Sequence, residues 1–297
     1  MDFNINKENN KRKYFIEKLS QKIFLICALI SVISLILIIG FIFYKGFQPF
    51  VSKGYSFTEF IFGQKWVPSS DKFGIFPMIL ASIYGTLGAV IIGAPVGVFT
   101  ALFISEIAPK KVGVVISNAV QLLAGIPSVL YGVFGLAVIV PTIQNLFNLP
   151  KGQTLLAVII VLAIMMLPTI VTVAETSIKA VPKSYKEASL ALGASKIETI
   201  FKVVLPAAKS GILAAVALGI GRAIGETMAV ILVAGNSVII PRGFADSVRP
   251  LTTNIALEMG YAFGTHQDML FATGIVLFIF IMIINLTILK LSSKVGK

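Results

Sequence analysis

Five long stretches of this sequence contain no charged residue. They are residues 23–43, 75–105, 112–150, 153–174 and 269–289. A helix needs about 20 apolar residues to cross the hydrocarbon core of a bilayer, and each stretch is long enough. Charged residues make up only 13% of the chain, whereas soluble domains carry about 25%. The sequence therefore predicts a helical integral membrane protein. It excludes a disordered chain and a transmembrane β-barrel, whose strands alternate.

Six membrane-spanning helices are expected. Five are predicted at residues 23–43, 76–103, 112–140, 153–174 and 269–289. The remaining span, 208–234, is interrupted by Arg222 and Glu226. The first span is longer than the apolar core of a signal peptide, which has about 7–15 residues, so we expect it to be retained.

The distribution of basic residues predicts the orientation of the chain. If both termini are cytoplasmic, the inner segments hold 17 Lys and Arg residues and the outer segments hold 7. Cytoplasmic loops collect Lys and Arg, so this bias favours an N-in, C-in topology. It also explains the net charge of +12 without a nucleic-acid partner, because no soluble basic domain is present to bind one.

The cytoplasmic segment 175–207 is predicted to form two short helices. Ser184 with Glu187, and Ser195 with Glu198, have the spacing of capping boxes. A glycine lies between them, where a helix C-terminus favours it. In the second helix an apolar stripe is formed by Ile197, Ile200, Phe201 and Val204. On patterning alone, this face packs either on a partner protein or back on the membrane bundle.

The same segment resembles the EAA motif of type I ABC importer permeases. Residues 187–206 contain EASLALG, then nine residues, then VVLP. The family pattern is E-A-A, three residues, G, nine residues and I-x-L-P, so Ser189 replaces the second alanine and Val203 the isoleucine. In that family the loop is a coupling helix that docks into a cytoplasmic ATPase. The resemblance implies that Glu187, Ala188 and Gly193 form the docking surface for the ATPase and the corner between the two helices.

Two opposite charges lie within the fifth span. A lone arginine inside a bilayer costs roughly 3 to more than 10 kcal/mol, so Arg222 is expected to face the bundle interior or a wet cavity. Glu226 follows four residues later, which places both side chains on one face of a continuous helix. The pair is then either a structural ion pair or part of an anion path. In such a path Arg222 offers the planar fork of donors that suits tetrahedral oxyanions, and Glu226 prevents tight binding.

The span with these charges strongly resembles the phosphate ABC transporter permeases of the PstC type. The matching segments are GIGRAIGETMAV at 219–230, QLLAGIPSVLYGVFGL at 121–136, and an outer loop from FIFG at 60–63 to FGI at 73–75. The resemblance covers nearly the whole chain beyond residue 20. It implies an all-α, six-span permease in the bacterial plasma membrane that forms half of the path of an ATP-driven phosphate importer. Arg222 and Glu226 would then lie in the substrate path.

The resemblance also implies partners and an organisation of the chain. The partners are a homologous permease, two cytoplasmic ATPase subunits, an extracytoplasmic phosphate-binding protein and inorganic phosphate. The implied segments are a cytoplasmic tail (1–22), the first transmembrane helix (23–43), an extracytoplasmic loop (44–75), a permease core (76–290) with its coupling loop (175–207), and a cytoplasmic tail (291–297).

Other functions are weighed against this one. The same permease architecture would serve molybdate or sulfate. An ion-coupled secondary carrier needs intramembrane acids and commonly shows inverted repeats, but only Glu226 is an acid clearly within a span. The sequence contains no P-loop, no Cys/His cluster and no nucleophile–base constellation, so we expect a non-catalytic subunit without metal or cofactor. The only histidine, His266, is expected to be a solvated loop residue.

Overall fold

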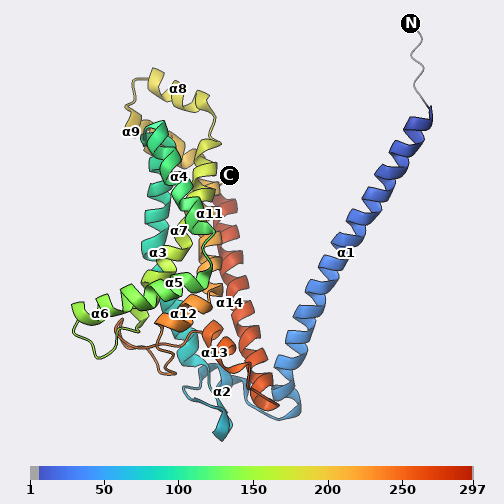
Figure 1. Cartoon of the computed structure of the whole chain (residues 1–297), viewed down its shortest axis with the longest axis vertical. Coiled ribbons are helices and arrows are strands. Elements are labelled where there is room, and N and C mark those ends of the chain that lie inside the picture. The colour runs from blue at the N-terminus through green and yellow to red at the C-terminus, as the bar shows by residue number, and fades with distance from the viewer. Residues whose placement is uncertain (1–6, 296–297) are drawn as a thin grey trace.

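The protein is almost entirely helical (Figure 1). The computed structural model describes the backbone of residues 7–295 and the side chains of 13–287 and 290, so the ends of the two predicted tails lie outside the described residues. In chain order the elements are α1 (Lys7–Ser52), α2 (Phe57–Phe62), β1 (Trp66–Val67), η1 (Pro68–Ser70), β2 (Lys72–Phe73), α3 (Phe76–Leu102), η2 (Phe103–Ile107), α4 (Lys110–Ala124), α5 (Ser128–Phe134), η3 (Gly135–Ile139), α6 (Val140–Leu146), α7 (Leu155–Lys179), α8 (Lys183–Ala191), α9 (Lys196–Thr199), η4 (Ile200–Val204), α10 (Leu205–Ala207), α11 (Lys209–Gly225), α12 (Met228–Val233), α13 (Leu251–Glu258) and α14 (Thr265–Val295). η1 is a 3₁₀-helix, and η2, η3 and η4 are π-helical turns.

α7 is the central helix of the bundle. Most of its side chains are buried, as expected for a helix that is apolar all round. On α3, a methyl group added at Gly93 would lie 2.7 Å from Met166 Sδ, and one at Gly97 would lie 2.7 Å from Ile170 Cγ2. On α11, a methyl group at Gly219 would lie 2.6 Å from Ile170 Cγ1. The glycines therefore let three helix backbones approach closely around Ile170.

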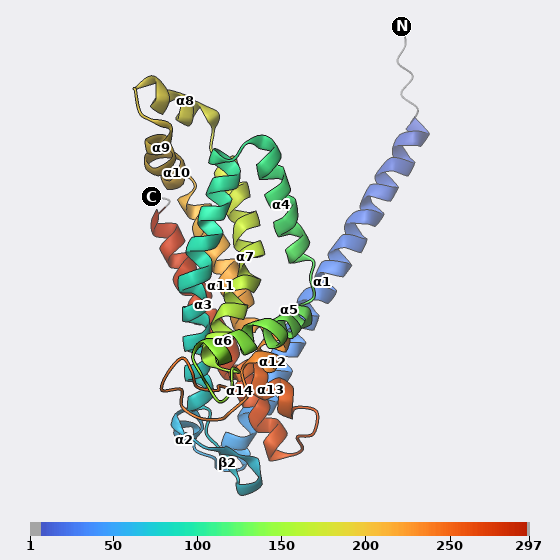
Figure 2. The ribbon, with the colours of Figure 1, turned by 60° about the vertical axis from the view of Figure 1, so that its left-hand side comes forward.

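α1 is a single helix of 46 residues. It contains the predicted span 23–43, but the polar segment before this span continues the same helix from Lys7. Most of its side chains before Phe41 are exposed, and its last part packs on α14, where the rings of Phe41 and Phe271 meet edge to face at 5.5 Å. α1 begins, and α14 ends, toward the end of the molecule that carries α8 (Figures 1 and 2). This placement agrees with an even number of membrane crossings.

The predicted third span, 112–140, is wrong as a single helix. α4 ends before Gly125, and α5 begins after Pro127, whose backbone is extended (φ −57°, ψ 139°). Proline has no N–H to continue a helix, which explains the break. α5 and α6 then run across the bundle axis rather than along it (Figures 1 and 2). In the described part of the chain five helical segments are long and apolar enough to cross a membrane, and one of them, Ser128–Leu146, is this crosswise α5–α6 segment. Counting the pair Lys196–Ala207 and Lys209–Gly225, bent by 69°, as one span gives six.

Each of the three π-helical turns ends two residues before a proline. The prolines are Pro109 after η2, Pro141 after η3 and Pro206 after η4. A proline ring crowds the carbonyl group four residues earlier and cannot donate to it. In all three cases that carbonyl belongs to the π turn, at Ser105, Ala137 and Lys202. In η3 and η4 the wider turn accommodates the proline within a continuing helix, whereas α3 ends after η2, because the backbones of Ala108 and Pro109 are extended.

Gly97→Ala is expected to destabilise the bundle, because the added methyl group would lie 2.7 Å from the fully buried Ile170. Overpacking of this kind costs about 1–3 kcal/mol. The measurement is the midpoint of thermal unfolding in detergent, which should fall. Gly40→Ala on α1 is the matched control, since a methyl group there meets nothing within 4 Å. An equal fall in both variants would contradict the close packing of α3 on α7.

Candidate functional site

Arg222 lies on α11, within the last turn of that helix. Its side chain is partly buried, and Nη1 donates a hydrogen bond to Thr169 Oγ1 on α7 at 3.3 Å. Among the described side chains, no carboxylate forms an ion pair with Arg222. A guanidinium group carries five N–H donors. In the part of the chain that the structure describes, Arg222 uses these donors in one hydrogen bond, to the hydroxyl group of Thr169.

Glu226 is not paired with Arg222. α11 ends one residue before Glu226, whose backbone is extended (φ −70°, ψ 132°). The predicted i, i+4 arrangement on one helical face is wrong, because it assumed a continuous helix over 208–234. Instead, Glu226 Oε1 accepts a hydrogen bond from Ala229 N in the first turn of α12 at 3.1 Å. The carboxylate is thus stabilised by a helix N-terminus rather than by the guanidinium.

Two broken helices meet beside these residues. A methyl group at Gly132 on α5 would lie 2.7 Å from Ala229 Cα on α12, so the two short helices are in close contact. The hydroxyl group of Tyr131 donates to Leu123 O at 2.7 Å and bridges the gap between α4 and α5. Irregular backbone at membrane depth is tolerated only inside protein or along a water-filled cavity. The meeting of two such breaks with Arg222 makes this region the candidate substrate path.

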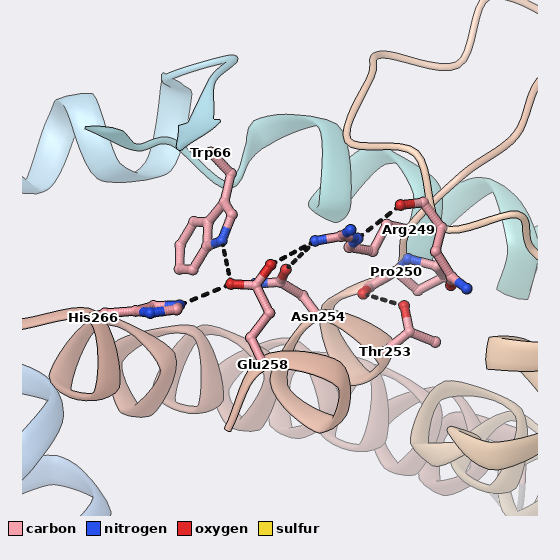
Figure 3. Close-up of polar contacts among 8 residues, drawn as sticks. Trp66, Arg249, Pro250, Thr253, Asn254, Glu258 and His266 are labelled. Atoms are coloured by element: carbon pink, nitrogen blue, oxygen red, sulfur yellow. Dashed lines mark hydrogen bonds and ion pairs between the residues drawn. The ribbon is translucent and has the colours of Figure 1, made fainter. Parts of the chain in front are cut away.

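A second polar site, which the sequence did not predict, surrounds Glu258 at the end of α13 (Figure 3). Glu258 Oε2 accepts a hydrogen bond from Trp66 Nε1 at 2.8 Å and lies 2.8 Å from His266 Nε2. Glu258 Oε1 accepts from Arg249 Nη1 at 2.7 Å. Arg249 Nη1 also lies 3.2 Å from Asn254 Oδ1. We call these five residues the outer polar cluster; the Glu258 side chain at its centre is 8% exposed.

The outer polar cluster joins the β1–β2 hairpin to α13 and α14. The expected solvated state of His266 is wrong, because its side chain is only 16% exposed and its ring packs beside Trp66, Phe73 and Tyr261. Burial raises the pKa of Tyr261, and the nearby Glu258 carboxylate adds to this rise. Trp66 and Glu258 are 192 positions apart, and a single sequence carries no signal for such a pairing.

The N-terminal end of α13 reaches the candidate substrate path. Thr252 Oγ1 donates to the backbone carbonyl of Glu226 at 3.0 Å. The backbone N–H of Leu251 donates to Ser82 Oγ on α3 at 3.0 Å. α13 is therefore held at one end by the outer polar cluster and at the other by Glu226 and α3.

The segment 175–207 projects from the opposite end of the bundle (Figure 2). Glu187 and Ala188 are exposed on α8. Gly193 follows the helix with φ +86°, a left-handed conformation that favours glycine, so the predicted corner is confirmed. No residue of α8 is buried within the chain. The three residues therefore lie on a surface that is open to a partner.

One of the two predicted capping boxes is present. Ser195 Oγ accepts from Glu198 N at 3.3 Å, and Ser195 N donates to Glu198 Oε2 at 3.0 Å. These bonds from Ser195, with a smaller contribution from Lys202, lower the pKa of Glu198. The first predicted box is wrong, since α8 begins after Pro182 and Ser184 makes no capping bond. A proline fixes the backbone for the start of a helix, which moves the start ahead of the serine.

The apolar stripe predicted in 196–204 is divided between two environments. Ile200 and Val204 are 3% and 0% exposed and belong to an apolar core with the inner ends of α3 and α7. Ile197 and Phe201 remain exposed. The π turn η4 changes the helical period here, so a stripe drawn at 3.6 residues per turn does not stay on one face.

Comparison with known proteins identifies the class to which this architecture belongs. A family model described as "Binding-protein-dependent transport system inner membrane component" matches residues 93–295. The chain belongs to this family, and it is a multi-pass membrane permease of the ABC transporter class. The expected fold and family are confirmed.

Named relatives cover most of the chain. The probable ABC transporter permease protein YqgH of Bacillus subtilis is 40% identical over 272 residues, covering 90% of this chain and 88% of that protein. The phosphate transport system permease protein PstC of Xylella fastidiosa (strain Temecula1) is 36% identical over 262 residues, covering 80% and 81%.

A solved structure has the same fold. The crystal structure of a bacterial alginate ABC transporter, in complex with an alginate pentasaccharide-bound periplasmic protein, contains a chain with a TM-score of 0.65 and 18% identity. The match covers 95% of this chain and 98% of that one.

Glu258→Gln is expected to destabilise the outer end of the protein. The substitution replaces one acceptor oxygen with an NH₂ group, which would face the donors of Trp66 or Arg249. Hydrogen bonds to charged groups contribute about 1.5–3 kcal/mol each. Thermal unfolding of the purified subunit, followed by the fluorescence of its single tryptophan, Trp66, should show a lower midpoint.

Glu59→Gln is the matched control for this prediction, because Glu59 is exposed on the neighbouring α2 and forms no ion pair among the described side chains. An unchanged midpoint in Glu258→Gln would mean that the outer polar cluster contributes nothing to stability.

Proposed function

We propose that this chain is a membrane-spanning permease subunit of an ATP-driven phosphate importer, and that it forms half of the translocation path. Membership of the binding-protein-dependent transport family supports the transport role. Several relatives that match over most of the chain are named phosphate transport system permease proteins. The substrate assignment rests on these relatives together with the chemistry of Arg222.

The observation that carries the proposal is a guanidinium group inside the membrane-spanning bundle with no carboxylate partner among the described side chains. Such a charge is expensive in a bilayer unless water or an anion compensates it. Its planar fork of donors matches the oxygens of phosphate. Thr169 orients the guanidinium through one hydrogen bond, and Glu226, held at the start of α12, repels a bound anion without neutralising Arg222.

Energy for transport comes from separate subunits in this proposal. Two cytoplasmic ATPases dock beneath the permeases, with Glu187, Ala188 and Gly193 of this chain at the contact. A homologous permease completes the pore, and an extracytoplasmic binding protein delivers phosphate. ATP binding moves the pair of permeases from an inward-facing to an outward-facing state, and hydrolysis resets them. This chain is a non-catalytic subunit of the assembly.

The proposed arrangement in the membrane follows the basic residues and the common direction of α1 and α14. Tails 1–22 and 291–297 and the coupling loop 175–207 are cytoplasmic, whereas the loop 44–75 is extracytoplasmic. The span 23–43 precedes a permease core over 76–290. The outer polar cluster then faces the binding protein, and α8 faces the ATPase.

Uptake of radiolabelled phosphate into proteoliposomes tests the proposed function. The vesicles contain this chain with its partner permease, ATPase and binding protein, with or without ATP in the compartment that faces the ATPase. We expect ATP-dependent accumulation that molybdate and sulfate do not inhibit. ATP-dependent uptake of another oxyanion would contradict the substrate, and uptake driven by an ion gradient without ATP would contradict the coupling.

Arg222→Gln is expected to reduce phosphate uptake while the complex still assembles. Losing one or two charge-assisted hydrogen bonds of about 1.5–3 kcal/mol each corresponds to a fall of roughly tenfold or more. Uptake and co-purification of the subunits are measured together. Lys209→Gln, at the cytoplasmic start of the same helix, is the control and should transport normally. Loss of assembly in Arg222→Gln would instead indicate a structural role for Arg222, through its contact with Thr169 of α7.

A further inference from the structure

α8 is attached to the rest of the chain in an unusual way. None of its residues is buried, whereas η4, which follows it closely, is anchored in an apolar core through Ile200 and Val204. α8 lies close to η4 and α9, and two polar side-chain contacts among the described residues join it to its neighbours, one from Lys186 and one from Ser189. α8 therefore contributes no buried apolar side chain to its own attachment, and its two polar contacts are with elements that are anchored.

The first contact joins α8 to the inner end of α3. Lys186 Nζ lies 2.5 Å from Glu106 Oε1, and the two residues are 80 positions apart in the sequence. The side chains are 25% and 10% exposed, so the pair is largely removed from water. Glu106 lies on η2, the π turn that ends α3. Removing one partner would leave a shielded charge unpaired, which is strongly unfavourable.

The second contact joins α8 to α9. Ser189 Oγ lies 2.9 Å from Thr199 Oγ1, and Thr199 is 4% exposed. Ser189 occupies the position where the EAA pattern has its second alanine. An alanine could not form this bond. The serine therefore gives this chain an additional attachment between α8 and the anchored part of the segment.

From α3 a continuous packed route leads to Arg222. Gly93 and Gly97 of α3 lie against Met166 and Ile170 of α7. Ile170 also lies against Gly219 of α11, one helical turn before Arg222. Closely packed interiors transmit displacement because they compress little. A movement of α3 at η2 is thus connected to the candidate substrate path by direct contacts.

We infer that the Lys186–Glu106 ion pair, supported by the Ser189–Thr199 hydrogen bond, is the contact through which movement of α8 reaches the membrane helices. Lys186, Glu106 and Ser189 are then positioning residues for ATP-driven transport. The inference rests on the proposed function, because it assumes that α8 is moved by an ATPase. It specifies α3 as the first membrane helix to receive that movement.

The test uses the complete reconstituted transporter and measures phosphate accumulated per ATP hydrolysed. In Glu106→Gln and in Lys186→Gln this ratio should fall about fivefold or more, the size of a coupling energy between two sites, while the subunits still co-purify. The exchanged pair Glu106→Lys with Lys186→Glu should recover most of the ratio. Lys183→Gln removes the same charge from α8 at a residue with no ion pair among the described side chains, and it should change the ratio by less than about twofold.

Unchanged ratios in both single variants would overturn the inference. So would a loss of ratio in the exchanged pair as large as in the single variants. Ser189→Ala removes a single hydroxyl group, so it tests the second contact without a buried charge. Its ratio should fall by a smaller factor than that of Lys186→Gln; no change would exclude Ser189 from the inference.

A distance measurement separates failure of the inference from failure of the proposed function. Spin labels are placed at Leu192→Cys, beside α8, and Ile107→Cys, on η2, in a Cys27→Ser background; both labelled residues are exposed and Cys27 is the only cysteine. In the labelled protein without further substitution, the distribution of distances between the labels should be narrow and should not change with ATP. In the labelled Glu106→Gln variant the distribution should be broad. A distance that changes with ATP in the parent would overturn the inference. A parent that shows no ATP-dependent phosphate uptake would overturn the proposed function instead.

Discussion

Backbone polar groups within a bilayer must find partners inside the protein, and the breaks in these helices show how this chain meets that requirement. At the α4–α5 break, the hydroxyl group of Tyr131 donates to Leu123 O. At the α11–α12 break, the Glu226 carboxylate accepts from Ala229 N, and Thr252 donates to the Glu226 carbonyl. Each break is completed by a side chain close to it in space. The Glu226 carboxylate therefore serves as a hydrogen-bond acceptor for the backbone of α12. This role also places its negative charge near the candidate substrate path.

This arrangement leaves Arg222 without an ion pair to any carboxylate whose side chain the structure describes, and it also leaves one side of α11 open. Gly221 and Gly225 flank Arg222, and a methyl group at either position would meet nothing within 4 Å. The other small pair, Gly93 and Gly97, is filled by α7 within the same chain. Two glycine pairs with the same spacing thus have different uses. One makes a helix contact inside the subunit, and the other leaves room beside the guanidinium for a second helix or for the path.

Local signals in the sequence predicted much of the local structure. The predictions failed at breaks within helices and where segments far apart in the chain meet. Four of the five long apolar stretches predicted spanning helices that are present, in α1, α3, α7 and α14. The Ser195–Glu198 spacing predicted a capping box that is present, and Gly193 predicted the corner. The Gly-Ile-Pro sequence at 125–127 coincides with the break in the third span, but α3 continues through Gly93-Ala94-Pro95, so this pattern alone does not predict a break. The outer polar cluster joins segments far apart in the chain, so His266 was placed in solvent. The end of α11 at Gly225 has no proline to mark it, and for this reason Glu226 was assigned to the wrong face.

Apolar packing runs through the centre of the bundle and into both of its ends, and a few polar contacts add to it at those ends. The centre of the bundle is an apolar core around α7, which is rigid because interiors are densely packed. Each end also has an apolar core, and polar side chains join further elements to it: the outer polar cluster around Glu258 at one end and the Lys186–Glu106 pair at α8 at the other. Such bonds contribute only about 0.5–3 kcal/mol each when exchanged with water, so they can be remade as the ends shift. A displacement applied at α8 would therefore pass through the centre with little loss. The displacement would then move the backbone at Glu226 and at the start of α13, where single hydrogen bonds hold it.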